Sequence, residues 1–360
     1  MSVVGMRNVC ILGKGGLQAA LTIKFSFRKV KANLTKTMAE DKDQFIVGVD
    51  LGGTYVRAGL VDRMGEITQM SKRAVDEIRS QKAVVDLLME LMGTFPKEKV
   101  AAISLGVPGI VNAAMGVVHA SPPFSEGKDF ALQKEIFKNL KKSVFIDNDA
   151  NRIALGEHWK GAAQEWDTFL MLTLGTGIGG AIIINSQIFH GTHGFTGEFG
   201  HIVVEASGPS CPCGGRGCLE TFASGSGLVR NLKEVFESDE DSLELKPIAS
   251  LLGQESSTIV AGLASQAEKG NLLARDMFLR FGYYLGIGLA SLVSATGIQK
   301  IILGGGISAS SGLFLNECRQ EMKNRLYAKT FEGVEIRLAK LGDRAGILGS
   351  GLVALQHLKK

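Results

Sequence analysis

Short apolar runs alternate with amphipathic stretches along most of this chain. Runs rich in β-branched residues predict strands at 45–49, 55–61, 100–105, 143–146, 168–174, 181–184, 301–303 and 334–338. Apolar residues at helical spacing predict helices at 80–95, 132–140, 152–159, 227–238, 258–269, 271–295, 312–327 and 344–358. Residues 116–130 follow neither pattern and are expected to form a loop. Strands that alternate with helices indicate an α/β fold, with a parallel or mixed sheet covered on both faces.

The same kind of turn joins two of the predicted strand pairs. The first turn is Asp50-Leu51-Gly52-Gly53-Thr54, and the second is residues 175–180, GTGIGG. They lie about 120 residues apart, which is close to the length of one domain. Two apolar strands around a glycine-threonine turn, placed twice in the chain, predict an internal duplication.

Glycine turns of this kind suit the binding of phosphate. Backbone N–H groups can approach an anion closely there, and Thr54 adds a hydroxyl donor. Asp50 would repel phosphate unless a cation lay between them, so we expect it to bind Mg²⁺ or its waters. A third cluster, Gly304-Gly305-Gly306, follows a strand and suits a flat group such as adenine or ribose. Each cluster alone is more often a structural turn, but the three together favour a nucleotide.

Four candidate zinc ligands fall within eighteen residues of the chain. They are His201, Cys211, Cys213 and Cys218. Three thiolates and one imidazole complete a tetrahedral Zn²⁺ shell and leave no position for water, so the metal is expected to be structural. His190 and His193 lie near enough in sequence to leave the identity of the fourth ligand open.

A disulfide is the alternative for these cysteines. A bond between Cys211 and Cys213 would be strained, and a bond between Cys213 and Cys218 would leave Cys211 unpaired. Two carboxylates, Glu198 and Glu220, bracket the cluster. We therefore expect zinc to fix this loop so that both carboxylates and the histidine face one pocket. Carboxylates held in a rigid frame suit hydrogen bonding to the hydroxyls of a sugar.

Polar side chains also follow the predicted strand 143–146. The sequence continues as Asp147-Asn148-Asp149-Ala150-Asn151, at the start of a predicted helix. Capping of the helix explains one of these polar side chains and not all of them. Asp149 is placed at a strand end to act as a general base on a hydroxyl that Asn148 holds. Residues 106–109, GVPG, form another turn at a strand end, where α/β proteins place ligands.

Composition places the chain among ordinary globular enzymes. Of 360 residues, 45% are hydrophobic and 21% are charged, which allows two domains with good cores. The formal net charge of +4 comes from residues 1–37, which carry seven basic side chains and no acid. The rest is slightly acidic, so neither a nucleic acid nor a membrane surface is expected as a partner. The uncharged run 281–299 is expected to be a buried core helix rather than a membrane span.

The cysteine count and the N-terminal residues bear on location. Five cysteines is an odd number, and Cys10 and Cys318 stand alone, which fits a reducing cytosol better than a disulfide framework. Residues 1–43 are basic and contain no acid before Glu40, a composition that a transit peptide shares. Met38 opens a natural start of the folded part, so we expect a poorly ordered N-terminal extension.

Several motifs taken together resemble one family. They are DLGGT at 50–54, GVPG at 106–109, IDNDAN at 146–151, LGTGIGG at 174–180, GEFGH at 197–201, CPCGGRGCLE at 211–220 and LGGG at 303–306. From about residue 44 onwards the chain resembles the ROK sugar kinases (repressors, open reading frames and kinases), and most closely their bacterial glucokinases. The combination of GEFGH with CPCGGRGCLE is highly specific, whereas the glycine turns are not.

The resemblance implies a duplicated actin-like, ribonuclease-H-like α/β ATPase fold with a cleft between two domains. The expected division is a small domain at 44–150, which the C-terminal helix 344–360 completes, and a large domain at 151–343 with the zinc-binding loop. The implied reaction transfers the γ-phosphoryl group of ATP to the 6-hydroxyl of a hexose, with glucose expected first. Mg²⁺ would accompany the nucleotide, Zn²⁺ would be structural, and a cytoplasmic homodimer is expected.

The resemblance also assigns roles to residues by motif. Asp149 is the expected base. The residues expected to bind the sugar are Gly109, Asn148, Glu198, His201 and Glu220. The residues expected to contact the nucleotide are Asp50, Gly52, Gly53, Thr54, Thr176, Gly177, Gly304 and Gly305. The expected zinc ligands are His201, Cys211, Cys213 and Cys218. The histidine would use one ring nitrogen for the metal and the other for a sugar hydroxyl.

The sequence departs from the family pattern near the expected sugar site. Ser121-Pro122-Pro123-Phe124 stands where many family glucokinases have an Asn after the proline, and Gly127 stands where they have Trp. Tyr55 follows DLGGT, where Lys is frequent. N-acetylmannosamine, N-acetylglucosamine, fructose or mannose therefore stay open as sugars, and polyphosphate as donor. The family also includes sugar-responsive repressors, but residues 1–43 are expected to be too short for a helix-turn-helix domain.

Overall fold

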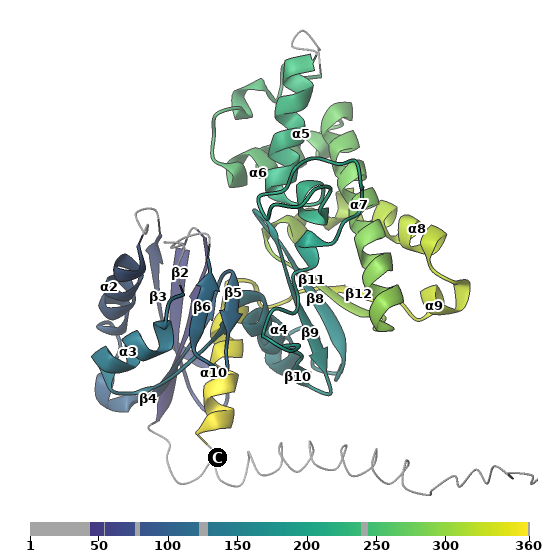
Figure 1. The fold of residues 1–360 in the computed structure, drawn as a ribbon. Coiled ribbons are helices and arrows are strands. Elements are labelled where there is room, and N and C mark those ends of the chain that lie inside the picture. Colours follow the sequence, from purple (N-terminus) through teal and green to yellow (C-terminus); the bar gives the residue numbers. More distant parts are fainter. Residues whose placement is uncertain (1–43, 54, 76–79, 122–128, 239–243, 359–360) are drawn as a thin grey trace, which may run out of the picture. The chain divides into compact units, whose positions relative to one another are not determined.

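The computed structural model describes residues 44–53, 55–75, 80–121, 129–238 and 244–358 (Figure 1). The expected N-terminal extension at 1–43 lies outside the described residues, and so does Thr54. The departures from the family pattern at 122–124 and at Gly127 lie outside them as well. The description below concerns the unit that begins at Phe45.

Five strands form an N-terminal sheet in the order β3-β2-β1-β4-β7. Their bounds are β1 Phe45–Leu51, β2 Tyr55–Val61, β3 Ile67–Ala74, β4 Val100–Val107 and β7 Ser143–Asn148. The first three strands pair antiparallel, whereas β4 runs parallel to β1 and β7 runs parallel to β4. Nearly every residue of β1 and β4 is buried, as expected for central strands covered on both faces.

The C-terminal sheet repeats this topology with the order β10-β9-β8-β11-β12. Its strands are β8 Phe169–Leu174, β9 Ile178–Ile184, β10 Gln187–Ile188, β11 Lys300–Gly304 and β12 Glu335–Leu338. As in the N-terminal sheet, the first three strands in sequence pair antiparallel, whereas β11 runs parallel to β8 and β12 runs parallel to β11. The predicted internal duplication is therefore confirmed, and the fold is the duplicated actin-like, ribonuclease-H-like α/β fold that the sequence analysis expected.

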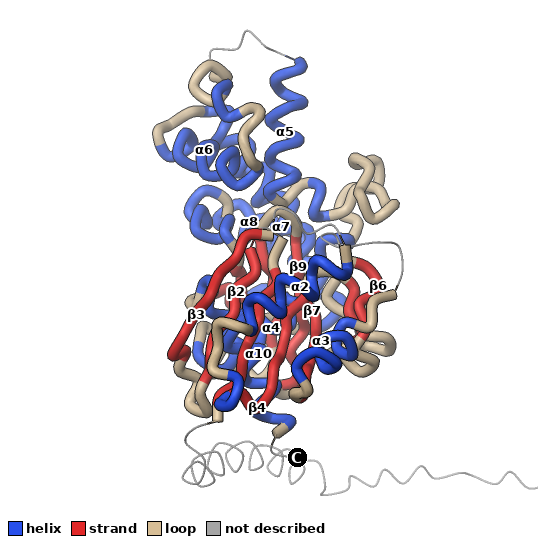
Figure 2. The backbone as a smooth tube through the Cα atoms, turned by 90° about the vertical axis from the view of Figure 1, so that its left-hand side faces the viewer, coloured by secondary structure: helices blue, strands red, loops and turns tan. Residues whose placement is uncertain are grey.

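Alternate residues of β1 face different helices of the N-terminal sheet. Val47 and Val49 belong to a core cluster with side chains of α2 and α3, which lie on one face (Figure 2). Ile46 instead packs with Ala354 and Leu355 of α10 on the other face. The helix bounds are α2 Gln81–Met92, α3 Leu132–Leu140 and α10 Ala345–His357. This alternation directs Asp50, on the same face of β1 as Ile46, toward the start of α10.

Helices from the second half of the chain pack around the C-terminal sheet. Their bounds are α4 Asp149–Lys160, α5 Gly225–Ser238, α6 Ser256–Glu268, α7 Leu272–Thr296, α8 Leu315–Arg325 and α9 Ala328–Glu332. Leu170 and Leu172 of β8 share a core cluster with residues of α5 to α8, whereas Met171 packs with Ala154 and Leu155 of α4. The two faces of β8 are thus covered by different helices.

Among the described residues, α7 is a helix long and apolar enough to span a membrane by length and composition. About half of its residues are buried, including Phe278 and Phe281, which lie in the C-terminal core. The ring of Phe281 lies 4.8 Å from that of Phe314. The helix therefore has the packing of a buried core helix, as the sequence analysis expected for 281–299.

Some predicted elements were wrong. Residues 116–130 were expected to be a loop, but β6 Val117–Ala120 pairs with β5 Ile110–Asn112, because Gly116 takes the positive φ of 68° that the tight turn requires. β3 was missed because its residues are mostly exposed and show no apolar alternation. The predicted helix 312–327 begins only at Leu315, after a 3₁₀ segment at Gly306–Leu313.

The expected division into two domains at residue 150 stays a prediction. Helix α4 begins at Asp149, at the end of β7, and contacts strands of both sheets. It also makes the most extensive helix–helix contact of the described structure, with α10. The pair α4 and α10 therefore joins the two halves of the duplicated fold.

Glycines permit this close contact between α4 and α10. A methyl group on Gly349 of α10 would overlap the backbone carbonyl of Arg152, and one on Gly156 of α4 would overlap the carbonyl of Ala345. A methyl group on Gly48 of β1 would likewise overlap the carbonyl of Ile347. The backbones touch here without intervening side chains, so these positions accept no larger residue without separation of the elements.

We predict that Gly349→Ala lowers the free energy of unfolding by about 1–3 kcal/mol, because the helices must move apart to admit the methyl group. Thermal unfolding followed by circular dichroism would measure this. The matched control is Gly312→Ala, since nothing lies within 4 Å of the added methyl group there. Equal melting temperatures for the two variants would contradict the prediction.

Candidate active site

Asp50 is buried at the end of β1, beside the first glycine turn. It lies opposite Arg57 in the β1–β2 hairpin and beside Gly106 of β4. Its carboxyl group lies so close to Gly346, at the start of α10, that a methyl group there would stand 2.7 Å from it. Burial raises the pKa of Asp50 to about 7, and the negative charge of Asp149 adds to this effect. A cation bound here would be strongly favoured by that buried charge.

Arg57 is a candidate functional residue that the sequence analysis did not name. Its Nη1 lies 4.0 Å from Oδ2 of Asp50, and its Nε lies 2.9 Å from Oδ2 of Asp343. The Arg57 charge opposes the rise in the pKa of Asp50. The hairpin register, which places residue 57 opposite residue 50, was a signal that could have found it. Asp343 gave no such signal, because it comes from a distant part of the chain.

The junction of β7 and α4 positions Asn148 and Asp149. Oδ1 of Asn148 caps α4 by accepting hydrogen bonds from the N–H groups of Ala150 (2.8 Å) and Asn151 (3.4 Å). Nδ2 of Asn148 donates to the carbonyl oxygen of Gly109 at 3.0 Å. Asn148 therefore makes the capping interaction predicted for this segment. The same side-chain amide links Asn148 to Gly109, the other predicted sugar-binding residue in this region.

Asp149 is the first residue of α4 and is partly buried. Burial raises its pKa to about 6; the hydrogen bond from the Ala150 N–H, at 2.8 Å, opposes the rise, and the charge of Glu198 contributes to it. The backbone of Asp149 packs against Gly106, where a methyl group would lie 3.1 Å from the Asp149 Cα. The fold thus brings Asp149 near both Asp50 and Glu198, which are far apart in sequence.

Glu198, His201 and Glu220 also lie together. Oε2 of Glu198 is 3.9 Å from Nε2 of His201. Burial raises the pKa of Glu198; the charge of His201 opposes this, and that of Glu220 adds to it. Oε2 of Glu220 accepts a hydrogen bond from the N–H of Ile178 at 2.7 Å. This leaves the second oxygen of Glu220 as the acceptor available to a ligand.

The second glycine turn is built around Glu220. A methyl group on Gly177 would overlap the Glu220 carboxylate, so a side chain at that position would displace the carboxylate. Thr176 is exposed, and its carbonyl oxygen accepts hydrogen bonds from the N–H (3.0 Å) and the hydroxyl (2.6 Å) of Ser226 at the start of α5. The predicted nucleotide turn and the predicted sugar ligand Glu220 are therefore in direct contact.

The remaining predicted nucleotide contacts differ in their surroundings. Nothing lies within 4 Å of a methyl group placed on Gly53, and the N–H of Gly52 closes the turn on the Tyr55 carbonyl at 3.0 Å. Gly304 and Gly305 pack against β8, and a side chain on Gly305 would overlap the carbonyl of Leu174. Close packing accounts for glycine at 304 and 305, and their predicted contact with a nucleotide stays a prediction.

The four predicted zinc ligands form one cluster. Nδ1 of His201 and the Sγ atoms of the three cysteines all lie within 4.8 Å of one another. Sγ of Cys213 is 3.7 Å from Sγ of Cys218, and Sγ of Cys211 is 3.6 Å from Nδ1 of His201. Zn–S bonds of about 2.3 Å in a tetrahedron place two sulfurs about 3.8 Å apart, so the donor set fits Zn²⁺.

The distance between Sγ of Cys213 and Sγ of Cys218 is too long for the disulfide that the spacing left open. A disulfide bond is about 2.05 Å long, and Cys211, Cys213, Cys218 and Cys318 are all free thiols. The ring of His201 turns Nδ1 toward the cysteines and Nε2 toward Glu198. The predicted division of the two ring nitrogens between a metal and a sugar hydroxyl stays a prediction.

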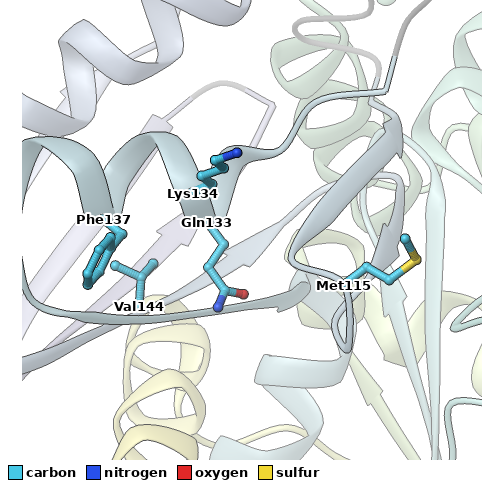
Figure 3. Close-up of a pocket in the computed structure, with 5 residues that line it drawn as sticks. All are labelled: Met115, Gln133, Lys134, Phe137 and Val144. Carbon is cyan, nitrogen blue, oxygen red and sulfur yellow. The ribbon is translucent and has the colours of Figure 1, made fainter.

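The structure also contains a cavity of about 290 Å³ (Figure 3). Its lining residues are Met115, Gln133, Lys134, Phe137 and Val144. It contains none of the predicted site residues, so it is not the predicted sugar or nucleotide site. The expected cleft between two domains stays a prediction.

Comparison with known proteins identifies the family. The model of the ROK family matches residues 46–357, and the chain belongs to this family. It is 34% identical to the glucokinase of Halalkalibacterium halodurans, over 88% of this chain and 96% of that protein. It is 31% identical to the xylose repressor of Bacillus subtilis, over 88% of this chain and 78% of the repressor.

A solved structure supports the same relationship. The crystal structure of a ROK family glucokinase from Streptomyces griseus, in complex with glucose and AMPPNP, matches with a TM-score of 0.74 at 30% sequence identity. The match covers 87% of this chain and 99% of the Streptomyces griseus chain. The whole duplicated fold is therefore shared, not one half of it.

We predict that Asn148→Ala costs about 1 kcal/mol more stability than Asn148→Ser, because serine keeps a helix-capping oxygen and alanine does not. Both variants lose the hydrogen bond to Gly109, so the difference between them isolates the cap. Urea-induced unfolding would measure it. Identical unfolding midpoints would show that the cap contributes nothing.

Proposed function

We propose that this protein is an ATP-dependent hexose kinase that phosphorylates the 6-hydroxyl of glucose. The observation that carries the proposal is that Asp149 lies near enough to both Asp50 and Glu198 for their charges to interact. Asp50 belongs to a glycine turn suited to phosphate, and Glu198 belongs to a group of polar acceptors suited to a sugar. The similarity to glucokinases over nearly the whole chain supports ATP as donor and glucose as acceptor.

In this proposal Asp149 is the general base. It accepts the proton of the 6-hydroxyl while the hydroxyl oxygen attacks the γ-phosphorus, and the bond from that phosphorus to the bridging oxygen breaks. With a pKa of about 6, the Asp149 carboxylate is ionised at neutral pH, and its pKa still lies close to the working pH. Gly109 and Asn148 hold the sugar beside the base, Glu198 and Glu220 accept hydrogen bonds from its other hydroxyls, and Nε2 of His201 donates one to it.

The two glycine turns hold the phosphates. Gly53 and Thr54 offer backbone and hydroxyl donors from the first turn, which the Gly52 N–H closes, and Thr176 and Gly177 offer donors from the second turn. Mg²⁺, held through Asp50, would neutralise phosphate charge. The guanidinium of Arg57 adds a fixed positive charge next to the first turn. The backbone at Gly304 and Gly305 would contact the adenosine.

We also propose that His201, Cys211, Cys213 and Cys218 hold a structural Zn²⁺. The cluster geometry and the donor set support this. Bound zinc would keep the loop that carries Glu198 in one conformation. It would also fix the tautomer of His201, whose Nε2 then faces the sugar as a donor.

Other functions remain as alternatives. Another hexose (N-acetylmannosamine, N-acetylglucosamine, fructose or mannose) would use the same base and the same acceptors. Similarity to a xylose repressor supports a sugar-responsive regulator as a second candidate. A gel-shift experiment tests that candidate, and we expect no shift. A cytoplasmic location and a homodimer are part of the proposal, supported by the family alone.

A coupled assay of ADP release with glucose, mannose, fructose, N-acetylglucosamine and N-acetylmannosamine tests the proposal. We predict the highest kcat/KM with glucose. Asp149→Asn is predicted to lower kcat by at least about 100-fold, because the base is lost, while glucose binding measured by calorimetry is retained. A variant with near-normal turnover would remove Asp149 from the role of base.

The pH dependence of the wild-type protein gives a second readout. Because only the ionised Asp149 accepts a proton, kcat/KM is predicted to fall as the pH falls through about 6. Arg344→Lys, which keeps the charge at an exposed position near Asp343, serves as a control with an unchanged profile. A rate that stays constant between pH 7 and pH 5 would contradict the assignment.

Elemental analysis tests the zinc proposal. We predict about one zinc per wild-type chain, and loss of zinc together with a lower melting temperature and weaker glucose binding in Cys213→Ser, because metal binding and local folding are linked. Cys318→Ala is the matched control, since Cys318 is buried outside the cluster and its variant should keep the metal. A Cys213→Ser protein with full stability and full glucose affinity would contradict the prediction.

A further inference from the structure

His190 makes a contact that the proposed roles do not use. Its Nε2 donates a hydrogen bond to Oδ2 of Asp147 at 2.9 Å. Asp147 is almost fully buried at the end of β7, whereas His190 comes from the segment that follows β10. The contact therefore joins an edge strand of the N-terminal sheet to a segment that leaves the C-terminal sheet.

The other oxygen of Asp147 supports the start of α4. Oδ1 of Asp147 accepts hydrogen bonds from the N–H of Asn148 at 2.8 Å and from Nδ2 of Asn151 at 2.9 Å. One carboxylate thus holds the β7–α4 junction with one oxygen and His190 with the other. That junction carries the proposed base Asp149.

The charges around Asp147 favour its ionised form. Burial alone would raise the pKa of Asp147, but the hydrogen bond from His190 and the charge of the buried Arg152 outweigh this and lower it. The hydrogen bond that His190 donates to Asp147 in turn raises the pKa of His190, against burial and the Arg152 charge. A charge-assisted hydrogen bond between two partly dehydrated groups is stronger than a neutral one.

The loop at residues 189–198 runs from this contact to Glu198. It contains Gly191, Gly194 and Gly197, which take φ values of 65°, 85° and 102°. A methyl group on Gly194 would lie 2.9 Å from the carbonyl oxygen of Val111 in β5, and one on Gly197 would overlap the carbonyl of Gly180 in β9. The loop thus packs closely against β5 in the N-terminal half of the fold and against β9 in the C-terminal half. His190 holds the first turn of the loop through its hydrogen bond to Asp147.

We propose that His190 is a positioning residue. Its hydrogen bond to Asp147 fixes the position of the 189–198 loop, and therefore of Glu198, relative to Asn148 and Asp149. This inference rests on the proposed hexose kinase function, because it assigns the loop to the sugar side of that site. The acceptors of the sugar and the base come from different halves of the fold, and the His190–Asp147 contact fixes their separation. A shift of about 1 Å at such a site can change rates by about 100-fold.

The test compares His190→Phe with His190→Gln. Phenylalanine removes the donor, whereas the glutamine amide can still donate to Asp147 from a similar position. We expect the phenylalanine variant to raise the KM for glucose about tenfold or more, with the KM for ATP within about twofold of wild type. We expect glutamine to restore most of the glucose affinity. A merely structural loss would affect both substrates and the melting temperature together.

Two further variants complete the design. His193→Phe changes an exposed histidine of the same loop that has no contact with Asp147, and it should leave the KM for glucose unchanged. In an Asp147→Asn background, His190→Phe should have a much smaller effect than in wild type, because the two residues act as a pair.

The outcomes separate this inference from the function on which it rests. A wild-type protein without turnover on any of the five hexoses overturns the proposed function and this inference with it. An active wild type with an unchanged KM for glucose in a folded His190→Phe protein overturns the inference alone. Equal and additive effects in the two Asp147 backgrounds would also overturn it.

Discussion

The crowding of carboxyl groups is the constraint on which the rest of the site depends. Burial raises the pKa values of Asp50, Asp149 and Glu198, and each of these groups also lies near another acid. Such an arrangement opposes folding unless donors or cations balance it. Rigid elements hold it in place: the capped start of α4 and the β1–β2 hairpin. The stability that these elements supply lets the protein keep an unfavourable set of charges where chemistry needs it.

Local patterns were sufficient to predict much of the fold. The strand–turn–strand units around DLGGT and GTGIGG leave a signal in neighbouring residues, so the duplication was readable before the two sheets were seen. The cysteine spacing likewise predicted the cluster, because its four ligands lie close in sequence. β3 could not be read, since an exposed edge strand carries few apolar residues. The β5–β6 pair depends on a glycine turn and not on periodicity.

Long-range partners were beyond the reach of the sequence. Nothing near Arg57 points to Asp343, and nothing near His190 points to Asp147, because these pairs form only when strands from distant segments meet. The bond from the Ile178 N–H to Glu220 is of the same kind. The motif residues themselves were identifiable one by one, whereas their distances and their influence on each other's pKa values follow from the tertiary fold.

The dependence of β1 on α10 has a consequence for synthesis on the ribosome. The last strand of the N-terminal sheet ends at Asn148, but the helix that covers one face of this sheet starts only at Ala345. At a translation rate of about 5–20 residues per second, α10 is synthesised roughly 10–40 s after β7, and that face of the sheet stays uncovered by α10 until then. During this interval the apolar side chains of a nearly finished sheet stay open to water, so a nascent chain of this protein offers chaperones a surface that the mature protein hides.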